Sequence, residues 1–274
     1  MNDNKISKNS IVAKFAVPIS FLILFFLAAN FTDCDLVTFW KRRSHLTDLV
    51  VDMIPPDFSY IQKILLPLFY TIQMSVTGTV LGIFFALVLS PFGAANLGFP
   101  AVIRRILRIV IQILRSFPAL ILALTATFLF GLGTFAGTFA ITLYTFAIMT
   151  KLTYEDASAA DVKAYQALRA MGVSKYVAYI HGILPEIIPG FLTNALYLLE
   201  TNVRHSSILG YVGAGGIGLL LNEKVSWREY SKVGMILILL FLVVYGMEAL
   251  SAVLTRLVQH ELTMGRAGQR LLTG

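Results

Sequence analysis

Two short stretches of the sequence carry residue types at spacings that could do chemistry. The first, Val212 to Gly218, reads VGAGGIG and fits the G-x-G-x-x-G spacing that cradles the pyrophosphate of a dinucleotide. That chemistry also needs a strand before the glycines, a helix after them and an acidic residue about 20 positions on. Long apolar stretches surround the segment instead. We interpret its glycines as irregular backbone that packs closely or lines a cavity. They are Gly213, Gly215, Gly216 and Gly218.

The second stretch combines charge with neutral hydrogen-bond donors at the end of an apolar run. Glu200 and Arg204 are four residues apart, in the order that favours a helical ion pair. One interpretation is an interfacial ion pair that stabilises the helix end. The other is that Arg204 lines a passage and meets an anion, for which a guanidinium is well suited. Neutral donors for the same passage would be Asn202, Ser206 and Ser207. Both interpretations remain open on the sequence.

The composition indicates that lipid is the solvent for much of the chain. Of the 274 residues, 57% are hydrophobic and only 14% are charged, and the mean hydropathy is +0.77. Soluble domains carry about 25% charged residues. The net charge of +7 comes from Lys and Arg in short runs between apolar blocks, a pattern typical of membrane topology rather than of a nucleic-acid surface.

Cysteine and histidine usage gives no indication of a metal site. The single Cys34 excludes an internal disulfide and a Cys-based zinc cluster. The four histidines are scattered over different segments without metal-ligand spacing: His45, His181, His205 and His260.

The apolar stretches predict an all-α, polytopic membrane bundle of about six transmembrane helices. Four of the candidate spans are residues 11–30, 60–93, 184–203 and 233–255. The other two are helices within 116–150, joined by a turn near Gly131. We expect the first span to be an uncleaved helix, although a cleavable signal peptide is the alternative. The spacing Gly78-x-x-x-Gly82 predicts close helix packing. Glu248 lies inside the last span, where it could pair with a neighbouring helix or mark a subunit interface.

The chain divides into three parts on this pattern. Residues 1–58 form an N-terminal span and an external amphipathic linker, 59–257 form the core, and 258–274 form a cytoplasmic tail. The orientation follows from Lys and Arg in the connecting segments, which we place in the cytoplasm. These residues are Arg104, Arg105 and Arg108 in one predicted loop, then Lys163, Arg169, Lys175, Arg256, Arg266 and Arg270. The cluster Lys41-Arg42-Arg43 falls on the opposite side and violates the rule.

The cytoplasmic segment at about 160–182 has the pattern of a helical elbow. Good helix formers precede Gly172, which tolerates a left-handed stop, and Ser174 can cap a second helix. Pro185 suits the first turn of the next membrane helix. Such an elbow is either a docking element or an ordinary loop.

The elbow resembles the cytoplasmic signature of ABC importer permeases, in which E-A-A, three residues, Gly, nine residues and I-x-L-P dock into the ATPase. Gln166, Leu168 and Gly182 depart from that signature, while the spacing from Gly172 to Leu184-Pro185 is kept. The resemblance implies that an ATPase-coupling surface includes Gln166, Ala167, Leu168, Gly172, Ser174, Lys175, Leu184 and Pro185.

Four further segments look like the phosphonate importer permeases, a resemblance that covers most of residues 55–255. The segments are Pro55-Pro56-Asp57-Phe58, Arg115-Ser116-Phe117-Pro118, Glu200 to Arg204 and Val212 to Gly218. Ala119 stands where those permeases often have an acidic residue, so no role of that acid is carried over. Methionine importer permeases are the nearest alternative.

The resemblance implies the type I ABC importer permease fold and a subunit of the bacterial inner membrane. The partners would be a second copy of the chain, two ATPase subunits, an extracytoplasmic binding protein and membrane lipid. No G-x-x-x-x-G-K-[ST] occurs, so we expect ATP and Mg²⁺ to be bound by the ATPase and no cofactor by this chain. The substrate would be a phosphonate or a related phosphorus oxyanion, and the glycines at 213–218 would form a bend near the external gate. A membrane enzyme acting on lipid phosphates would need catalytic clusters that the sequence lacks, and a channel working without ATP would not need the elbow.

Overall fold

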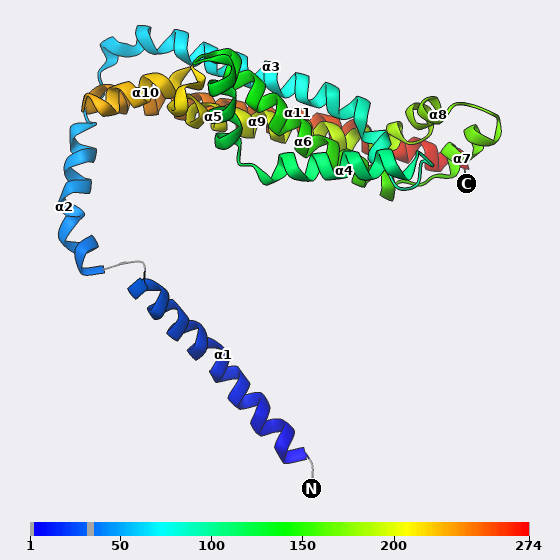
Figure 1. Ribbon diagram of the computed structural model, residues 1–274, viewed down its shortest axis with the longest axis horizontal. Helices are drawn as coiled ribbons and strands as arrows, with labels where there is room; N and C mark the ends of the chain where they lie inside the picture. Colours follow the sequence, from blue (N-terminus) through cyan, green and yellow to red (C-terminus); the bar gives the residue numbers. More distant parts are fainter. Residues whose placement is uncertain (1–2, 32–35, 274) are drawn as a thin grey trace. The chain divides into compact units, whose positions relative to one another are not determined.

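The computed structural model describes residues 3–31 and 36–273, with side chains described for 16–29, 31 and 40–258 (Figure 1). The chain separates into two units, residues 1–54 and 55–274. The first unit consists of α1 (Asp3–Phe31) and α2 (Leu36–Asp52). α1 covers the predicted first span and holds the apolar stretch Ala16–Ala29. α2 lies in the predicted amphipathic linker, and on it the guanidinium carbon of Arg43 lies 4.3 Å from the Trp40 ring centre.

The regular secondary structure of the second unit is all helical in the part of the chain that the structure describes, as the sequence predicts. Its helices in chain order are η1 (Phe58–Tyr60), α3 (Ile61–Gly93), α4 (Ala101–Ser116), α5 (Ala119–Phe130), α6 (Thr134–Ala159), α7 (Lys163–Ala170), α8 (Lys175–Gly182), α9 (Leu184–Leu209), η2 (Gly210–Ala214), α10 (Ile217–Ser226) and α11 (Tyr230–Thr273). The long helices α3, α6, α9 and α11 run along a common direction, with α7 and α8 at one end of the bundle and α10 toward the other (Figure 1).

Three of the described helices are long and apolar enough to cross a bilayer alone: Phe58–Gly93, Thr134–Ala159 and Tyr230–Val258. Two bent pairs raise the number to five if each pair crosses once. α4 and α5 meet at 94°, and α8 meets the α9 segment at 69°. The predicted helix pair around Gly131 is present as α5 and α6.

The prediction of a loop at Arg104, Arg105 and Arg108 is wrong, because all three lie on α4. α4 is amphipathic, with its charged residues spaced on one face of the helix. In the sequence, these charges looked like a break between two apolar spans. Its inner face buries Ile111 completely, and Arg108 Nε donates to the carbonyl of Gly93 at 2.9 Å. These arginines are therefore fixed on a helix that leads into the bundle, rather than held in a free loop.

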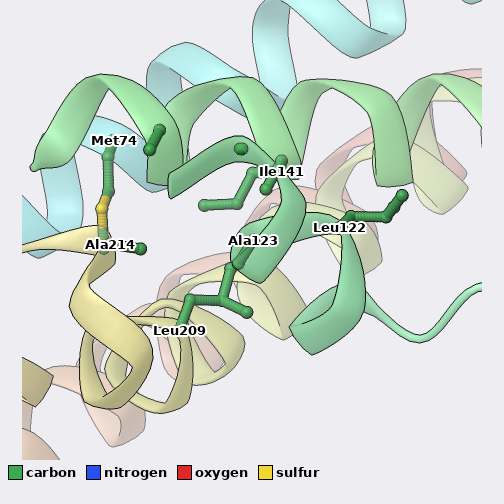
Figure 2. Close-up of a cluster of buried hydrophobic side chains, with 9 residues drawn as sticks. Met74, Leu122, Ala123, Ile141, Leu209 and Ala214 are labelled. Atoms are coloured by element: carbon green, nitrogen blue, oxygen red, sulfur yellow. The ribbon is translucent and has the colours of Figure 1, made fainter. Parts of the chain in front are cut away.

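Close packing of α3 on α6 positions the rest of the core. A Cβ added at Gly78 would lie 2.8 Å from Ile141 Cβ, and one at Gly82 would lie 2.7 Å from Thr145 Cβ. The predicted G-x-x-x-G contact is thus confirmed, with α6 as its partner. Next to it, a buried apolar cluster joins α3, α5, α6, α9 and η2, and includes Met74, Ile141 and Leu209 (Figure 2).

Candidate functional site

The elbow at residues 160–182 has the geometry that its pattern predicts. α7 ends before Gly172, whose φ is +85°, and the Val173 N–H donates to the carbonyl of Leu168 at 3.2 Å. The Ser174 hydroxyl caps α8 by accepting from the N–H of Val177 at 3.4 Å. Pro185 lies in the first turn of α9. The turn between the two short helices therefore depends on a backbone conformation that favours glycine.

Contacts with the α3–α4 connection fix the elbow to the bundle. The buried Tyr165 hydroxyl on α7 donates to the carbonyl of Leu97 at 2.7 Å. On α8, the Lys175 ammonium donates to the carbonyl of Gly98, and the Tyr179 hydroxyl lies 3.4 Å from Ser90 Oγ. Burial raises the pKa of the Tyr179 phenol, so it stays neutral and keeps its proton for hydrogen bonding. Movement of the elbow would be passed to α3 and α4 through these contacts.

Gly182 departs from the permease signature for a visible reason. A Cβ at this position would lie 2.8 Å from the backbone N and Cα of Tyr165, because α8 crosses α7 there. An isoleucine would not fit at this crossing without separating the helices. The departure is thus a packing adjustment in the elbow and leaves its turn unchanged.

The predicted coupling residues fall into two groups. Gln166, Ala167, Gly172, Ser174 and Pro185 are exposed or partly exposed. Leu168, Lys175 and Leu184 are half-buried, and the two leucines pack against the cluster around Tyr165 and Tyr179. Met171 is 70% exposed beside the turn, and Val177 and Ile180 of α8 are exposed as well. The first group is therefore accessible from outside the chain, and the two leucines of the second group pack beneath it.

The candidate passage residues on α9 also separate into two faces. Asn202 and Ser206 are fully buried in a polar network with α3 and α6. Asn202 Nδ2 donates to the hydroxyls of Thr79 and Thr145, both at 2.8 Å. The Ser206 hydroxyl donates to the carbonyl of Asn202 at 2.7 Å and pairs with Ser75. In this conformation neither Asn202 nor Ser206 can touch a solute.

The other face of α9 carries the predicted ion pair. Arg204 Nη2 lies 2.9 Å from Glu200 Oε1, and the Arg204 side chain is still 52% exposed. The Ser207 hydroxyl donates to the carbonyl of Arg204 at 2.7 Å. The ion pair and a role for Arg204 at a passage are therefore compatible, because pairing with Glu200 leaves half of the Arg204 side chain accessible.

The glycine segment forms the bend between α9 and α10. Gly213, Gly215 and Gly216 have φ values of +90°, +79° and +72°. The bend is fixed from two sides: the Gly133 N–H donates to the carbonyl of Gly213 at 3.0 Å, and the Ile217 N–H donates to the Thr71 hydroxyl at 2.8 Å. Gly218 packs so closely that a Cβ there would meet the carbonyl oxygen of Ser207. No strand precedes the bend in the described part of the chain, so it lacks the context of a dinucleotide site.

The sequence did not predict a cavity at the break between α4 and α5. A cavity of about 330 Å³ lies there, and Tyr144 and His205 are on its wall. The only sequence signal was the segment Arg115 to Pro118, which ends α4 and starts α5. Over the described residues, no group of three or more His, Cys, Asp or Glu side chains could bind a metal ion.

Long apolar helices, an elbow of two short helices packed against the end of the bundle and a buried glycine bend are the features of a membrane transport subunit. Residues 78–260 match the family described as "Binding-protein-dependent transport system inner membrane component". The chain belongs to this family. It is therefore an inner-membrane permease subunit of an ABC transporter and is not itself an ATPase, and the family implies an ATPase and a binding protein as partners.

Curated relatives extend over most of the chain. The phosphite transport system permease protein PtxC of Stutzerimonas stutzeri is 31% identical over 222 residues, which are 81% of this chain and 81% of that protein. The phosphate-import permease protein PhnE of Mycolicibacterium smegmatis is 32% identical over 200 residues, 73% of this chain and 38% of that protein.

The fold itself is found among solved structures. An inward-facing structure of the MetNI methionine ABC transporter contains a chain with a TM-score of 0.64 and 21% identity, covering 74% of this chain and 99% of that one. At this identity the likeness establishes the ABC importer permease fold and leaves the substrate open.

Proposed function

We propose that the protein is the permease subunit of an ATP-driven importer for phosphonates or related phosphorus oxyanions such as phosphite or phosphate esters. The observation that carries the proposal is the similarity, at 31% identity over 81% of the chain, to a permease named for phosphite transport. The permease named for phosphate import supports the same class of solute. In both names the solute contains phosphorus bonded to oxygen.

The exposed charge on α9 fits an anionic solute. The guanidinium of Arg204 presents donors that match the oxygens of a phosphorus oxyanion. Half of its side chain is accessible in the single chain. A single exposed guanidinium gives weak, reversible contact, which a transported solute needs in order to leave.

Transport would use two copies of the chain and two ATPase subunits, with a binding protein outside. ATP and Mg²⁺ would bind only to the ATPases, and closure of the ATPases would draw the two elbows together. The contacts of Tyr165, Lys175 and Tyr179 would pass this movement to α3 and α4, and the pathway between the copies would open outward. Hydrolysis would return it to the inward-open state.

Reconstitution tests the proposal directly. The permease is placed in proteoliposomes with its ATPase and binding protein, and uptake of labelled phosphite is measured with and without ATP. We expect ATP-dependent uptake that unlabelled methylphosphonate inhibits and methionine does not. Inhibition by methionine alone would favour the methionine-type importer, whose fold the chain shares. Uptake without ATP would contradict the coupling mechanism.

A further inference from the structure

The first turn of α10 is capped by a side chain from another helix. Gly216 stands at the N-cap position of α10 and has no side chain that could accept a hydrogen bond. The N–H of Ile217 instead donates to the hydroxyl of Thr71 on α3 at 2.8 Å. Ile217 is fully buried and Thr71 is only 2% exposed, so both groups are shielded from water. The start of α10 therefore takes its hydrogen-bond acceptor from α3.

Thr71 and Gly216 are matched to each other at this contact. The Thr71 hydroxyl also donates to the carbonyl of Pro67 at 2.9 Å, so the same group is used as donor and as acceptor. A Cβ added at Gly216 would collide with the hydroxyl oxygen of Thr71. Glycine at position 216 is therefore what allows α3 to come close enough to cap α10.

α3 also reaches the elbow. The helix runs from the α10 end of the bundle to the end where α7 and α8 lie (Figure 1). Near its end, Ser90 Oγ lies 3.4 Å from the Tyr179 hydroxyl of α8, and the segment after α3 accepts hydrogen bonds from both elbow helices. Thr71 and Ser90 are nineteen residues apart, or about 28 Å along one continuous helix. One helix thus contacts the elbow and the start of α10.

The covalent link between α9 and α10 does not by itself fix the position of α10. Gly213, Gly215 and Gly216 all have positive φ values, in a region that glycine adopts freely. At the other end of α10, the Lys224 ammonium lies 3.1 Å from the carboxylate of Glu229, just before α11. Contacts with α3 at one end and beside α11 at the other therefore help to fix α10 against the bundle.

We infer that Thr71 is a positioning residue for transport, because its hydroxyl makes α10 follow α3 when the elbow moves. α3 carries the displacement of the elbow to Thr71, and the cap passes it to the first turn of α10 and to the glycine bend. The bend lies toward the end of the bundle opposite the elbow, so the far end of the pathway moves together with α3. This inference rests on the proposed function and adds the residue through which the movement reaches that end.

The first test compares Thr71→Val with Thr71→Ser in the complete complex in proteoliposomes. Valine has the shape of threonine without the hydroxyl, whereas serine keeps the hydroxyl. We expect phosphite uptake per ATP hydrolysed to fall about threefold in Thr71→Val, because the Ile217 N–H loses its acceptor. Thr71→Ser should match wild type. ATP hydrolysis stimulated by the loaded binding protein should stay near the wild-type rate in both, since the ATP site is on another chain.

Thr77→Val is the matched control, because Thr77 is an exposed threonine on the same helix. It should keep the wild-type uptake per ATP. Wild-type coupling in Thr71→Val would overturn the inference. An equal loss in Thr71→Val and Thr71→Ser would overturn it as well, because serine retains the capping hydroxyl.

A second test follows the cap directly and needs no solute. Hydrogen exchange of the peptide that contains Ile217 is measured by mass spectrometry in the wild-type complex, with and without a non-hydrolysable ATP analogue. We expect equal protection in both states, because α10 stays bonded to α3. Exchange should be about tenfold faster in Thr71→Val.

Loss of protection in the wild-type complex when the analogue binds would show that α10 separates from α3. That result would overturn the inference even if Thr71→Val failed to assemble. A wild-type complex that hydrolyses ATP but carries no phosphorus oxyanion would instead refute the proposed function, and the exchange measurement would still test Thr71.

Discussion

Asn202 holds three helices together at one residue. Its amide on α9 donates to Thr79 of α3 and to Thr145 of α6, both at 2.8 Å, and the side chain is fully buried. Thr145 is eleven residues from the start of α6, so the junction lies about 16 Å into the helix. No water from outside can replace these hydrogen bonds at that depth, so the junction stabilises the packing of the bundle rather than contacting a solute.

Replacing Asn202 with alanine should therefore destabilise the fold. Two hydroxyls lose their donor, and interhelical hydrogen bonds in membranes contribute about 1–2 kcal/mol. We expect Asn202→Ala to lower the thermal unfolding midpoint of the purified permease in detergent by several degrees. Ser207→Ala, on the more exposed face of the same helix, should leave it unchanged. Equal midpoints for the two variants would show that the network adds no stability.

Alanine substitutions at two glycines in different backbone conformations test whether the bend needs glycine. Gly216 has a φ of +72°, and a Cβ on it would meet the hydroxyl of Thr71, which accepts from Ile217. Gly246 lies within α11, and a Cβ on it would meet nothing within 4 Å. We expect Gly216→Ala to destabilise the protein by about 1–3 kcal/mol. Gly246→Ala should stabilise it slightly, because alanine is the better helix former. A denaturation series on both variants would contradict this explanation if their midpoints shifted alike.

At the level of helices and turns, some features could be predicted from sequence patterns alone. The elbow was predictable because glycine, a serine cap and a proline mark its turn and its boundaries locally. The sequence also predicts that the polar side chains of α9 fall on two faces. Residues 202 and 206 are one turn apart on one face, while 200, 204 and 207 lie on another. Which face is buried depends on α3 and α6, distant in sequence, so it could not be assigned. The cavity was missed for the same reason, since its wall comes from three separate helices.

The turn of the elbow gives a graded prediction. Gly172 has a φ of +85°, and a Cβ on it would meet nothing within 4 Å, so a substitution there causes conformational strain rather than a clash. Asparagine tolerates this backbone region better than β-branched residues do. We expect Gly172→Val to lower uptake per ATP hydrolysed severely and Gly172→Asn to lower it mildly. Uptake and ATP turnover of the reconstituted complex provide the measurement, and full activity of Gly172→Val would refute a role for the turn in coupling.

One of the three polar contacts from the elbow to the bundle can be removed by deleting a single hydroxyl. Tyr165→Phe removes the 2.7 Å hydrogen bond to Leu97 while keeping the ring buried, at a cost of about 1 kcal/mol. We expect ATP hydrolysis to continue while uptake falls, because α7 is no longer tied to the α3–α4 connection. Tyr176→Phe is the control, since Tyr176 makes only ring contacts with Phe92 and Tyr179 in the described structure. Equal uptake in both variants would exclude this path of transmission.

At the scale of the whole molecule, the second unit presents two kinds of surface. α3 exposes large apolar side chains such as Leu66 and Phe69, as expected of a face in lipid. Arg115, Tyr144 and Arg204 lie on the faces of α4, α6 and α9, where contact with lipid would be costly. The polar surface must therefore be covered in the membrane by water or by protein, which a pathway between two copies of the chain would provide.

Chemical labelling distinguishes these two surfaces in the assembled complex. Cys34, the only native cysteine, is first replaced with serine, and single cysteines are then introduced by Ile208→Cys at the cavity and Phe69→Cys on α3. The two side chains are similarly exposed, at 55% and 60%. A hydrophilic maleimide reacts only with a thiolate that water can reach, so we expect Ile208→Cys to be modified and Phe69→Cys to remain unreacted. If the ATP-driven movement proposed above occurs, the rate at position 208 should also change when ATP closes the ATPases. Equal labelling at both positions would mean that Ile208 faces lipid as Phe69 does, and a rate at 208 insensitive to ATP would mean that this face of α9 does not change its access during the cycle.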